Sequence, residues 1–164
     1  MLYALEILTV LLIALTMGLS LAHALEYPGK LRLSKPHYLA VQQIYYPGFT
    51  FAGIGELLGV IGALGVAILT PAGDPAFWPW WIAFGAMLLT HATYWLVTHP
   101  VNNFWLRSTE LGGAGAGFFG FDFLTRGIDG SDWTALRDRW EFSHIARAAF
   151  SVCGLLAAVM AVSV

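Results

Sequence analysis

Charged residues are scarce in this chain of 164 residues, since 11% are Asp, Glu, Lys or Arg whereas 58% are hydrophobic. A soluble domain carries about 25% charged residues, so an ordinary water-facing surface is excluded. The single cysteine, Cys153, excludes an internal disulfide. The net charge of -2, with cations and anions mixed, argues against a nucleic-acid partner. The composition therefore indicates a protein of the lipid bilayer.

Four apolar stretches each have about the 20 residues that a helix needs to cross a bilayer. They cover residues 2–25, 49–69, 78–97 and 142–162. The first lacks the basic start of a secretory signal peptide, so we expect it in the mature protein. We predict an all-α integral membrane protein, a single domain over residues 1–164 that forms a four-transmembrane-helix bundle.

The turn between the second and third stretches, residues 70–77, contains no lysine or arginine. All eight Lys and Arg residues belong to the opposite end of the predicted bundle, in the other two connections or just inside the fourth stretch. Short loops rich in Lys and Arg stay in the cytoplasm. We therefore expect both termini on the non-cytoplasmic side, in the inner (cytoplasmic) membrane of a bacterium.

The two basic connections have predicted structure of their own. Prolines punctuate the first connection around a short helix over residues 38–45. The second is a cytoplasmic loop over about residues 100–139, whose glycine- and phenylalanine-rich run at 112–121 is either a mobile surface segment or a lid over a site. Ser131 and Asp132 are typical of a helix start, and that helix should continue into the fourth stretch.

Ionisable side chains inside the predicted spans gather at the basic end. Counted inward from the cytoplasmic ends, His23 and His144 lie about four residues deep, or roughly 6 Å. Glu56 and His91 both lie about nine residues deep, or roughly 13 Å. Such groups cost about 2.5–3.5 kcal/mol each to insert, and they normally face the interior of a bundle with partners. We therefore predict one buried polar site near the cytoplasmic face.

Three interpretations fit these residues. In the first, His23, His91 and His144 hold haem b or a transition metal such as Fe, Cu or Zn, and Arg147 balances negative charge. In the second, the histidines and carboxylates act as acid and base on a substrate from the lipid phase, without a cofactor. In the third, they form a structural network in which Glu56 pairs with His91 or Arg147.

The haem or metal centre is the first of these hypotheses. It implies a membrane-embedded redox protein of the oxygenase or oxidase type, with an electron-transfer partner. The candidate metal ligands are His23, Glu26, Glu56, His91, His99 and His144. No Glu-x-x-His pair occurs in the sequence, so the pattern of di-iron carboxylate bundles is absent. The rival from another class is a non-enzymatic structural or assembly subunit of a membrane complex.

Small residues form one face of the second stretch. Gly55, Gly59, Gly62 and Gly65 recur every three or four residues, a spacing that allows another helix to approach closely. The neighbouring helix could belong to the same bundle or to another subunit. Because four helices expose a wide perimeter to lipid, we expect a homo-oligomer, either a dimer or a trimer.

Three short motifs follow one another at the basic end. They are Val41-Gln42-Gln43-Ile44-Tyr45, Pro100-Val101-Asn102-Asn103, and Trp140-x3-His144-x2-Arg147. In this order they resemble the small four-helix membrane proteins of the anthrone oxygenase-like family, over about residues 18–156. The resemblance implies a four-helix bundle and, for the fungal members that act on polyketides, oxygenation of an anthrone to an anthraquinone.

The resemblance also implies site residues at the matching positions, namely Asn102, Asn103, Trp140, His144 and Arg147. This chain departs from the family pattern by having four further ionisable residues in its spans. They are His23, Glu26, Glu56 and His91. Together the motifs and the polar set give four candidate catalytic residues, which are Glu56, Asn102, Asn103 and Arg147. A cofactor-free oxygenase of anthrone-like lipophilic substrates is the enzymatic alternative to the haem or metal centre.

Overall fold

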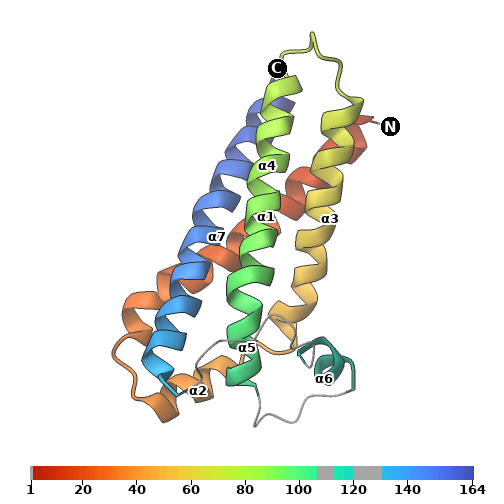
Figure 1. The fold of residues 1–164 in the computed structure, drawn as a ribbon. Helices are drawn as coiled ribbons and strands as arrows, with labels where there is room; N and C mark the ends of the chain where they lie inside the picture. The colour runs from red at the N-terminus through yellow and green to blue at the C-terminus, as the bar shows by residue number, and fades with distance from the viewer. Residues whose placement is uncertain (1, 107–112, 120–130) are drawn as a thin grey trace.

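A computed structural model describes residues 2–106, 113–119 and 131–164 of the chain. Within these residues the protein is helical, and four long helices lie side by side (Figure 1). Three of the described helices are long and apolar enough to cross a membrane, namely α1 (Leu2–Lys30), α3 (Gly48–Leu69) and α7 (Trp133–Val162). The fourth long helix, α4 (Phe77–Thr93), has 17 residues, and it continues directly as a π-helical segment, η1 (Tyr94–Thr98), and as α5 (His99–Trp105).

The four long helices form a ring. Helix α1 packs against α3 and α7, and α4 packs against the same two helices from the other side. Both termini lie at one end of the bundle, while the short helices α2 (Lys35–Gln43) and α6 (Gly113–Phe119) lie at the opposite end (Figure 1). The described lysines and most of the described arginines also lie at the end that carries α2 and α6.

Two helix boundaries that lie near prolines differ from the predicted ones. Helix α1 continues through Pro28 to Lys30, whose buried ammonium lies 3.0 Å from the Glu26 carboxylate one turn earlier. Helix α2 begins at Lys35, before the predicted residue 38, with Pro36 in its first turn. Proline is favourable there because the N–H that it lacks would have no partner in the helix.

The connection predicted as a loop over residues 100–139 is partly helical. Pro100 lies in the first turn of α5, so the chain stays helical beyond the predicted end at residue 97. Helix α7 begins at Trp133 and runs to Val162 without a break, as predicted. The glycine- and phenylalanine-rich run contains α6, while residues 107–112 and 120–130 lie outside the described part of the chain.

Asp132 caps the start of α7. Its carboxylate accepts hydrogen bonds from the Thr134 hydroxyl and from the backbone N–H groups of Thr134 and Ala135. The hydroxyl bond and the two backbone bonds hold the pKa of Asp132 below its ordinary value. The cap predicted from the sequence is thus present, and it satisfies N–H groups that a helix leaves unpaired in its first turn.

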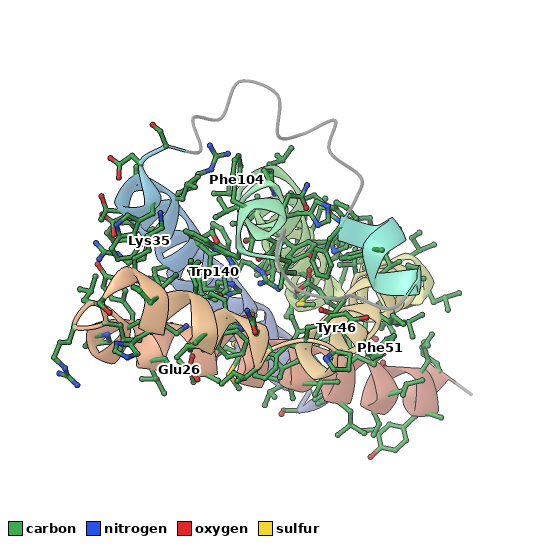
Figure 2. All side chains as sticks on the ribbon, turned by 90° about the horizontal axis from the view of Figure 1, so that it is seen from below. Glu26, Lys35, Tyr46, Phe51, Phe104 and Trp140 are labelled. Atoms are coloured by element: carbon green, nitrogen blue, oxygen red, sulfur yellow. The ribbon has the colours of Figure 1, made fainter. Side chains whose placement is uncertain are left out.

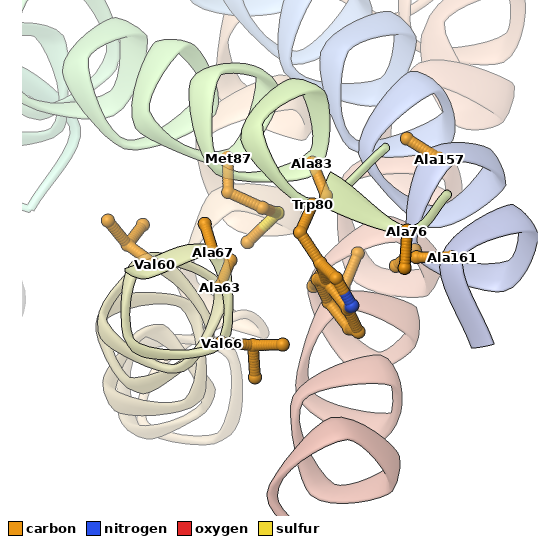
Figure 3. Close-up of a cluster of buried hydrophobic side chains, with 12 residues drawn as sticks. Val60, Ala63, Val66, Ala67, Ala76, Trp80, Ala83, Met87, Ala157 and Ala161 are labelled. Atoms are coloured by element: carbon orange, nitrogen blue, oxygen red, sulfur yellow. The ribbon is translucent and has the colours of Figure 1, made fainter. Parts of the chain in front are cut away.

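The half of the bundle nearer the termini has a compact apolar core, which we call the alanine core. Trp80 and Met87 of α4 fill its centre, and alanines of α3, α4 and α7 surround them (Figure 3). Among the described residues, its largest side chains are fully buried. Small side chains allow the four helices to approach closely in this half.

Three of the four predicted glycines of α3 pack inside the bundle rather than between subunits, whereas a Cβ at Gly65 would meet no described atom within 4 Å. A Cβ atom at Gly55 would lie 3.2 Å from Leu15, and one at Gly59 would lie 3.5 Å from Leu12. At Gly62 a Cβ would lie 2.6 Å from the Thr9 hydroxyl, so only glycine fits there. Helix α1 therefore occupies this face, and the expected dimer or trimer stays a prediction that needs a different interface.

Candidate functional site

A cavity of about 270 Å³ lies in the half of the bundle opposite to the termini. Residues of all four long helices line it, together with residues of η1, α5, α6 and the segment that follows α2. Seen from below, Trp140 lies toward the α1–α2 side of this end, and Tyr46 lies toward the α3–α6 side (Figure 2). Ligand pockets measure about 300–1,000 Å³, so this cavity suits a compact ligand.

Aromatic side chains form a large part of the cavity wall. Seven of the side chains that form it are Tyr45, Phe49, Tyr94, Trp95, Trp105, Phe119 and Trp140. The π-helical segment η1 contributes two of them, and such segments occur often at functional sites because they change the direction of neighbouring side chains. At Gly115 of α6 any Cβ would clash with the Tyr46 hydroxyl, which explains a glycine at this contact. An aromatic wall favours a flat apolar ligand.

Glu56 is the polar centre of the site. Its side chain is buried, and two other helices supply its partners. Arg147 of α7 donates from Nη2 to Oε2 at 2.6 Å, and His91 of α4 lies 3.0 Å from Oε1 through its Nδ1. Both carboxylate oxygens are therefore paired. A buried charge is tolerated only with such a partner, since an unpaired one is strongly destabilising.

The direction of the hydrogen bonds at His91 follows from its neighbours. The Trp95 indole nitrogen lies 3.0 Å from His91 Nε2. An indole N–H can only donate, so Nε2 accepts. The proton of a neutral imidazole is then on Nδ1, from which His91 donates to Glu56. Both nitrogens of His91 are thereby engaged within the protein.

The same reasoning applies to His144. Arg147 Nη1 lies 3.2 Å from His144 Nδ1, and because a guanidinium has no acceptor, the imidazole accepts through Nδ1. The proton of neutral His144 is therefore on Nε2. Among the described residues, this Nε2 has no hydrogen-bond partner, although the side chain is only 3% exposed and lines the cavity. The site thus presents a buried N–H donor without an acceptor.

His23 lies directly beside His144 in the wall. The centroids of the two imidazole rings are 4.2 Å apart, and the His23 ring also packs against Tyr45 at 4.4 Å and Trp140 at 5.1 Å. Among the described residues, Nδ1 of His23 is buried without a hydrogen bond, at 3.7 Å from the Glu26 carboxylate. Both imidazoles therefore line the same cavity, while the Nδ1 atom of His23 lies beside Glu26, which is not part of the wall.

A second polar cluster lies between the His23 wall and the end of the bundle. We call it the Lys30 network, and its members are Glu26, Lys30, Tyr38, Tyr45 and Glu141. Lys30 Nζ lies between the two carboxylates, at 3.0 Å from Glu26 and 3.6 Å from Glu141. Tyr45 donates to Glu26 at 2.5 Å, and Tyr38 donates to Glu141 at 2.9 Å. Burial raises the pKa of both tyrosine hydroxyls, so they stay neutral donors.

Of the remaining predicted residues, Asn102 lines the cavity, whereas Asn103 and His99 do not. The Asn102 carbonyl accepts a hydrogen bond from the Trp140 indole at 2.8 Å, so it holds a wall residue in place. Asn103 is buried but is not part of the cavity wall. His99 is fully buried outside the wall, with its Nδ1 3.2 Å from the Tyr94 hydroxyl and its ring against Phe118.

The six predicted metal ligands do not come together as one set. No group of three or more His, Cys, Asp or Glu side chains within the described residues could hold a metal ion. The engaged nitrogens of His91 and the guanidinium of Arg147 beside His144 both oppose ligation of a cation. The residues present therefore fit a metal or haem poorly. The metal centre stays a prediction.

Four residues that shape the site were not predicted from the sequence, although the sequence contains a signal for some of them. Trp95 lies four residues after His91, and Lys30 lies four after Glu26, so each pair shares a helix face and could have been found from its spacing. Tyr94 belongs to a π-helical turn that the hydrophobic pattern does not reveal. Glu141 contacts α1 and α2, which are far away in the sequence, so nothing local indicates its partners.

Known proteins add no constraint to this geometry. Comparisons of the chain with models of protein families, with curated proteins and with solved structures found no match. The resemblance to anthrone oxygenase-like proteins therefore stays a prediction based on three short motifs.

Proposed function

We propose that the protein is a four-span membrane oxygenase that acts without a cofactor on a compact, lipophilic aromatic hydroxyl compound, such as the enol form of an anthrone. The observation that carries this proposal is the contact between His23 and His144 in the wall of an aromatic cavity. Nε2 of His144 has no hydrogen-bond partner among the described residues, and His23 lies beside it in the wall. A ligand oxygen is the group that such a pair would bind.

The fourth span of the proposal consists of α4 continued by η1 and α5. Helix α4 alone is slightly short of the length of about 20 residues that a membrane needs, and its continuation supplies the rest. The distribution of Lys and Arg supports both termini outside the cytoplasm. A reporter fused after Val164 or inserted at Gly73 should lie outside, and one inserted at Gly115 should lie inside. The reverse result would contradict this topology.

Substrate binding is explained by the shape and the donors of the cavity. The aromatic wall would stack against a flat ring system that dissolves in the bilayer. His144 Nε2–H would donate to the hydroxyl oxygen of the substrate, which satisfies a buried donor that otherwise has no acceptor among the described residues. Burial in an apolar cavity strengthens that hydrogen bond once the oxygen becomes an anion.

The reaction needs one base and molecular oxygen. His23 removes the proton from the substrate hydroxyl, and the phenolate delocalises its electrons to the ring carbon opposite the oxygen. That carbon forms a C–O bond with O2, and protonation by His23 gives a hydroperoxide. The C–H and O–O bonds of the hydroperoxide then break, leaving a carbonyl group and water. Overall, a CH2 group of the keto form plus O2 becomes C=O plus H2O.

Glu56 and Arg147 act in this proposal as positioning residues. Arg147 keeps the proton of His144 on Nε2, and Glu56 fixes Arg147 from the other side. His91 in turn holds Glu56 through a bond whose direction Trp95 determines. Such a chain of fixed donors would place one N–H toward the substrate without reorganisation during the reaction.

The test is conversion of anthrone to anthraquinone by purified protein, followed by absorbance and by uptake of one O2 per anthrone. His144→Leu should lose about 100-fold or more in rate, since one donor to an oxyanion contributes about 10²–10³-fold. His144→Gln, which keeps an N–H donor, should retain part of the activity. His37→Leu, which changes an exposed histidine outside the site, should behave as wild type. Equal activity in all three variants would reject the assignment of His144.

A haem or metal centre is the second candidate, because His23 and His144 adjoin each other with nitrogens that no described residue satisfies. Metal analysis and an absorption spectrum of protein purified in mild detergent separate the two candidates. Stoichiometric iron, copper or zinc that His23→Ala removes would replace the cofactor-free reaction. Protein that neither binds anthrone nor holds a metal would favour the non-enzymatic assembly subunit.

A further inference from the structure

The residues that line the cavity differ in how far they are exposed on the surface of the bundle. On the side of α3, the lining residues Ile54 and Leu57 are 60% and 44% exposed, and Gly53 between them and the end of the bundle is exposed as well. On the neighbouring α4 and η1, the lining residues His91 and Trp95 are also partly exposed. The gap between these helices is therefore the part of the wall where the cavity reaches the lateral surface.

Within the described residues, the end of the cavity that faces α2, α5 and α6 is formed mainly by buried side chains, while Tyr46 and Phe118 there are partly exposed. Its lining side chains Gln42, Trp105, Phe119 and Trp140 are all buried. Tyr45 adds a further buried ring next to Trp140, with which it stacks at a centroid distance of 6.1 Å. A ligand that entered from this end would have to displace several packed aromatic rings, whereas the lateral gap needs no such rearrangement.

Gly53 keeps the lateral gap open. A Cβ atom built at this position would meet no other described atom within 4 Å. The glycine is therefore not required by packing, unlike Gly62 against Thr9 in the other half of the same helix. A large side chain at residue 53 could be accommodated by the fold, and it would lie at the exposed part of the cavity wall.

We propose that the gap between α3 and α4, bounded by Gly53, Leu57, His91 and Trp95, is a lateral portal through which apolar molecules enter the cavity from the hydrocarbon layer. The inference rests on the membrane-spanning arrangement proposed above and is independent of the reaction. At this depth α3 presents Phe51, Ile54 and Leu58 outward, and a bilayer is the surrounding that suits such a surface. The portal restricts the substrate class to molecules that partition into lipid.

The experiment uses a cysteine inside the cavity and two maleimides. Thr16 lines the cavity, is 3% exposed and donates to a carbonyl of its own helix, so Thr16→Cys is a mild change. The full-length protein is reconstituted into phosphatidylcholine vesicles and treated with a lipid-soluble benzyl maleimide or with a sulfonated, water-soluble maleimide. Native Cys153, exposed on α7, serves as the internal reference for reagent in the bilayer.

The portal predicts that the benzyl reagent labels the introduced cysteine while the sulfonated reagent does not. Adding Gly53→Trp to the Thr16→Cys protein should slow the labelling of the introduced cysteine by about tenfold or more, without changing that of Cys153. The matched control is Gly18→Trp, because Gly18 is exposed on α1 and also has no described neighbour within 4 Å of a Cβ, but is not part of the wall.

Two outcomes would overturn the portal. One is labelling of the introduced cysteine by the sulfonated reagent at the rate of the benzyl reagent, which would indicate an opening to water. The other is an unchanged rate of benzyl labelling when Gly53→Trp is added. Neither outcome depends on oxygenase activity, so failure of the portal and failure of the proposed reaction are separate results. A circular dichroism spectrum of each variant confirms that the helices are intact.

Discussion

The two halves of the bundle are built in opposite ways. Around Trp80 and Met87, alanines and glycines bring the helices close, and the interior is apolar and closed. Around Glu56, large aromatic side chains keep the same helices around a cavity whose wall includes three histidines and an ion pair. The difference teaches that one half is packed closely while the other keeps a cavity open, in which we propose that a ligand binds.

Stability and function are thus divided along the helix axis. In the closed half a change of volume at a buried contact should affect stability, because the core there has little space for added atoms. In the open half a change of charge or hydrogen bonding should dominate, because the ion pair between Glu56 and Arg147 is buried there. Four substitutions compare the two halves, in order of expected effect.

The largest effect is expected from Arg147→Met in the open half. The change leaves the buried carboxylate of Glu56 without its cation, and breaking a buried pair typically costs about 3–5 kcal/mol. Unfolding in detergent followed by circular dichroism measures the loss. The double variant Arg147→Met with Glu56→Gln removes both charges and should recover most of the stability. A double variant as unstable as the single one would contradict the pairing.

In the closed half, Gly62→Val should destabilise by about 1–3 kcal/mol, since the new side chain would overlap the Thr9 hydroxyl and strain the contact between α3 and α1. Gly65→Val on the same helix is the control, because a Cβ there meets no described atom within 4 Å. The same unfolding assay compares them. Equal stability of the two variants would mean that α1 does not lie against this face.

A smaller effect is expected from Tyr38→Phe in the Lys30 network. The variant removes the hydroxyl that donates to buried Glu141, which keeps Lys30 as a neighbour, and should cost about 0.5–1.5 kcal/mol, the typical net contribution of a hydrogen bond. Tyr27→Phe keeps the ring contact with Phe142 and serves as the control. If the two variants unfold at the same denaturant concentration, the hydrogen bond to Glu141 contributes nothing.

The smallest effect is expected from Asp132→Ala at the start of α7. Because hydrogen bonds lower the pKa of Asp132 in the folded state, its contribution is present above the unfolded value of 3.8 and is lost as the pH falls through the folded value. Thermal unfolding at neutral pH should show a slight decrease for Asp132→Ala, and Asp132→Ser should retain the cap. At a pH below the folded pKa, the wild type and Asp132→Ala should converge.

The sequence predicted more about the position of the site than about its chemistry. Equal depth in the spans brought Glu56 and His91 to one level, and they do form a hydrogen bond. Hydropathy could not show that Trp95 and Arg147 engage the imidazoles of His91 and His144, because such contacts depend on helix rotation and on a π-helical turn. From a sequence, a histidine can be interpreted as a metal ligand. Only its neighbours in the structure show whether its nitrogens are already engaged in hydrogen bonds.

Boundaries were predicted less well than spans, and for a local reason. In a sequence, Pro28 and Pro100 both indicate the end of a helix. In the structure, Pro28 lies inside α1, and Pro100 lies in the first turn of α5, a helix that continues the preceding one. The glycines of α3 predicted close packing correctly but could not distinguish α1 from a second subunit. Only the contacts of Gly55, Gly59 and Gly62 with α1 make that distinction.

The central claim is that the open half binds an aromatic ligand, and saturable binding of anthrone by the purified protein tests it most directly. Ala52 lines the cavity, so Ala52→Trp fills the space without removing a polar group. The account predicts that anthrone quenches the intrinsic fluorescence of wild-type protein saturably in a fixed amount of detergent, and that Ala52→Trp abolishes saturation. Identical titrations of the two proteins would contradict it, because binding would then occur outside the cavity.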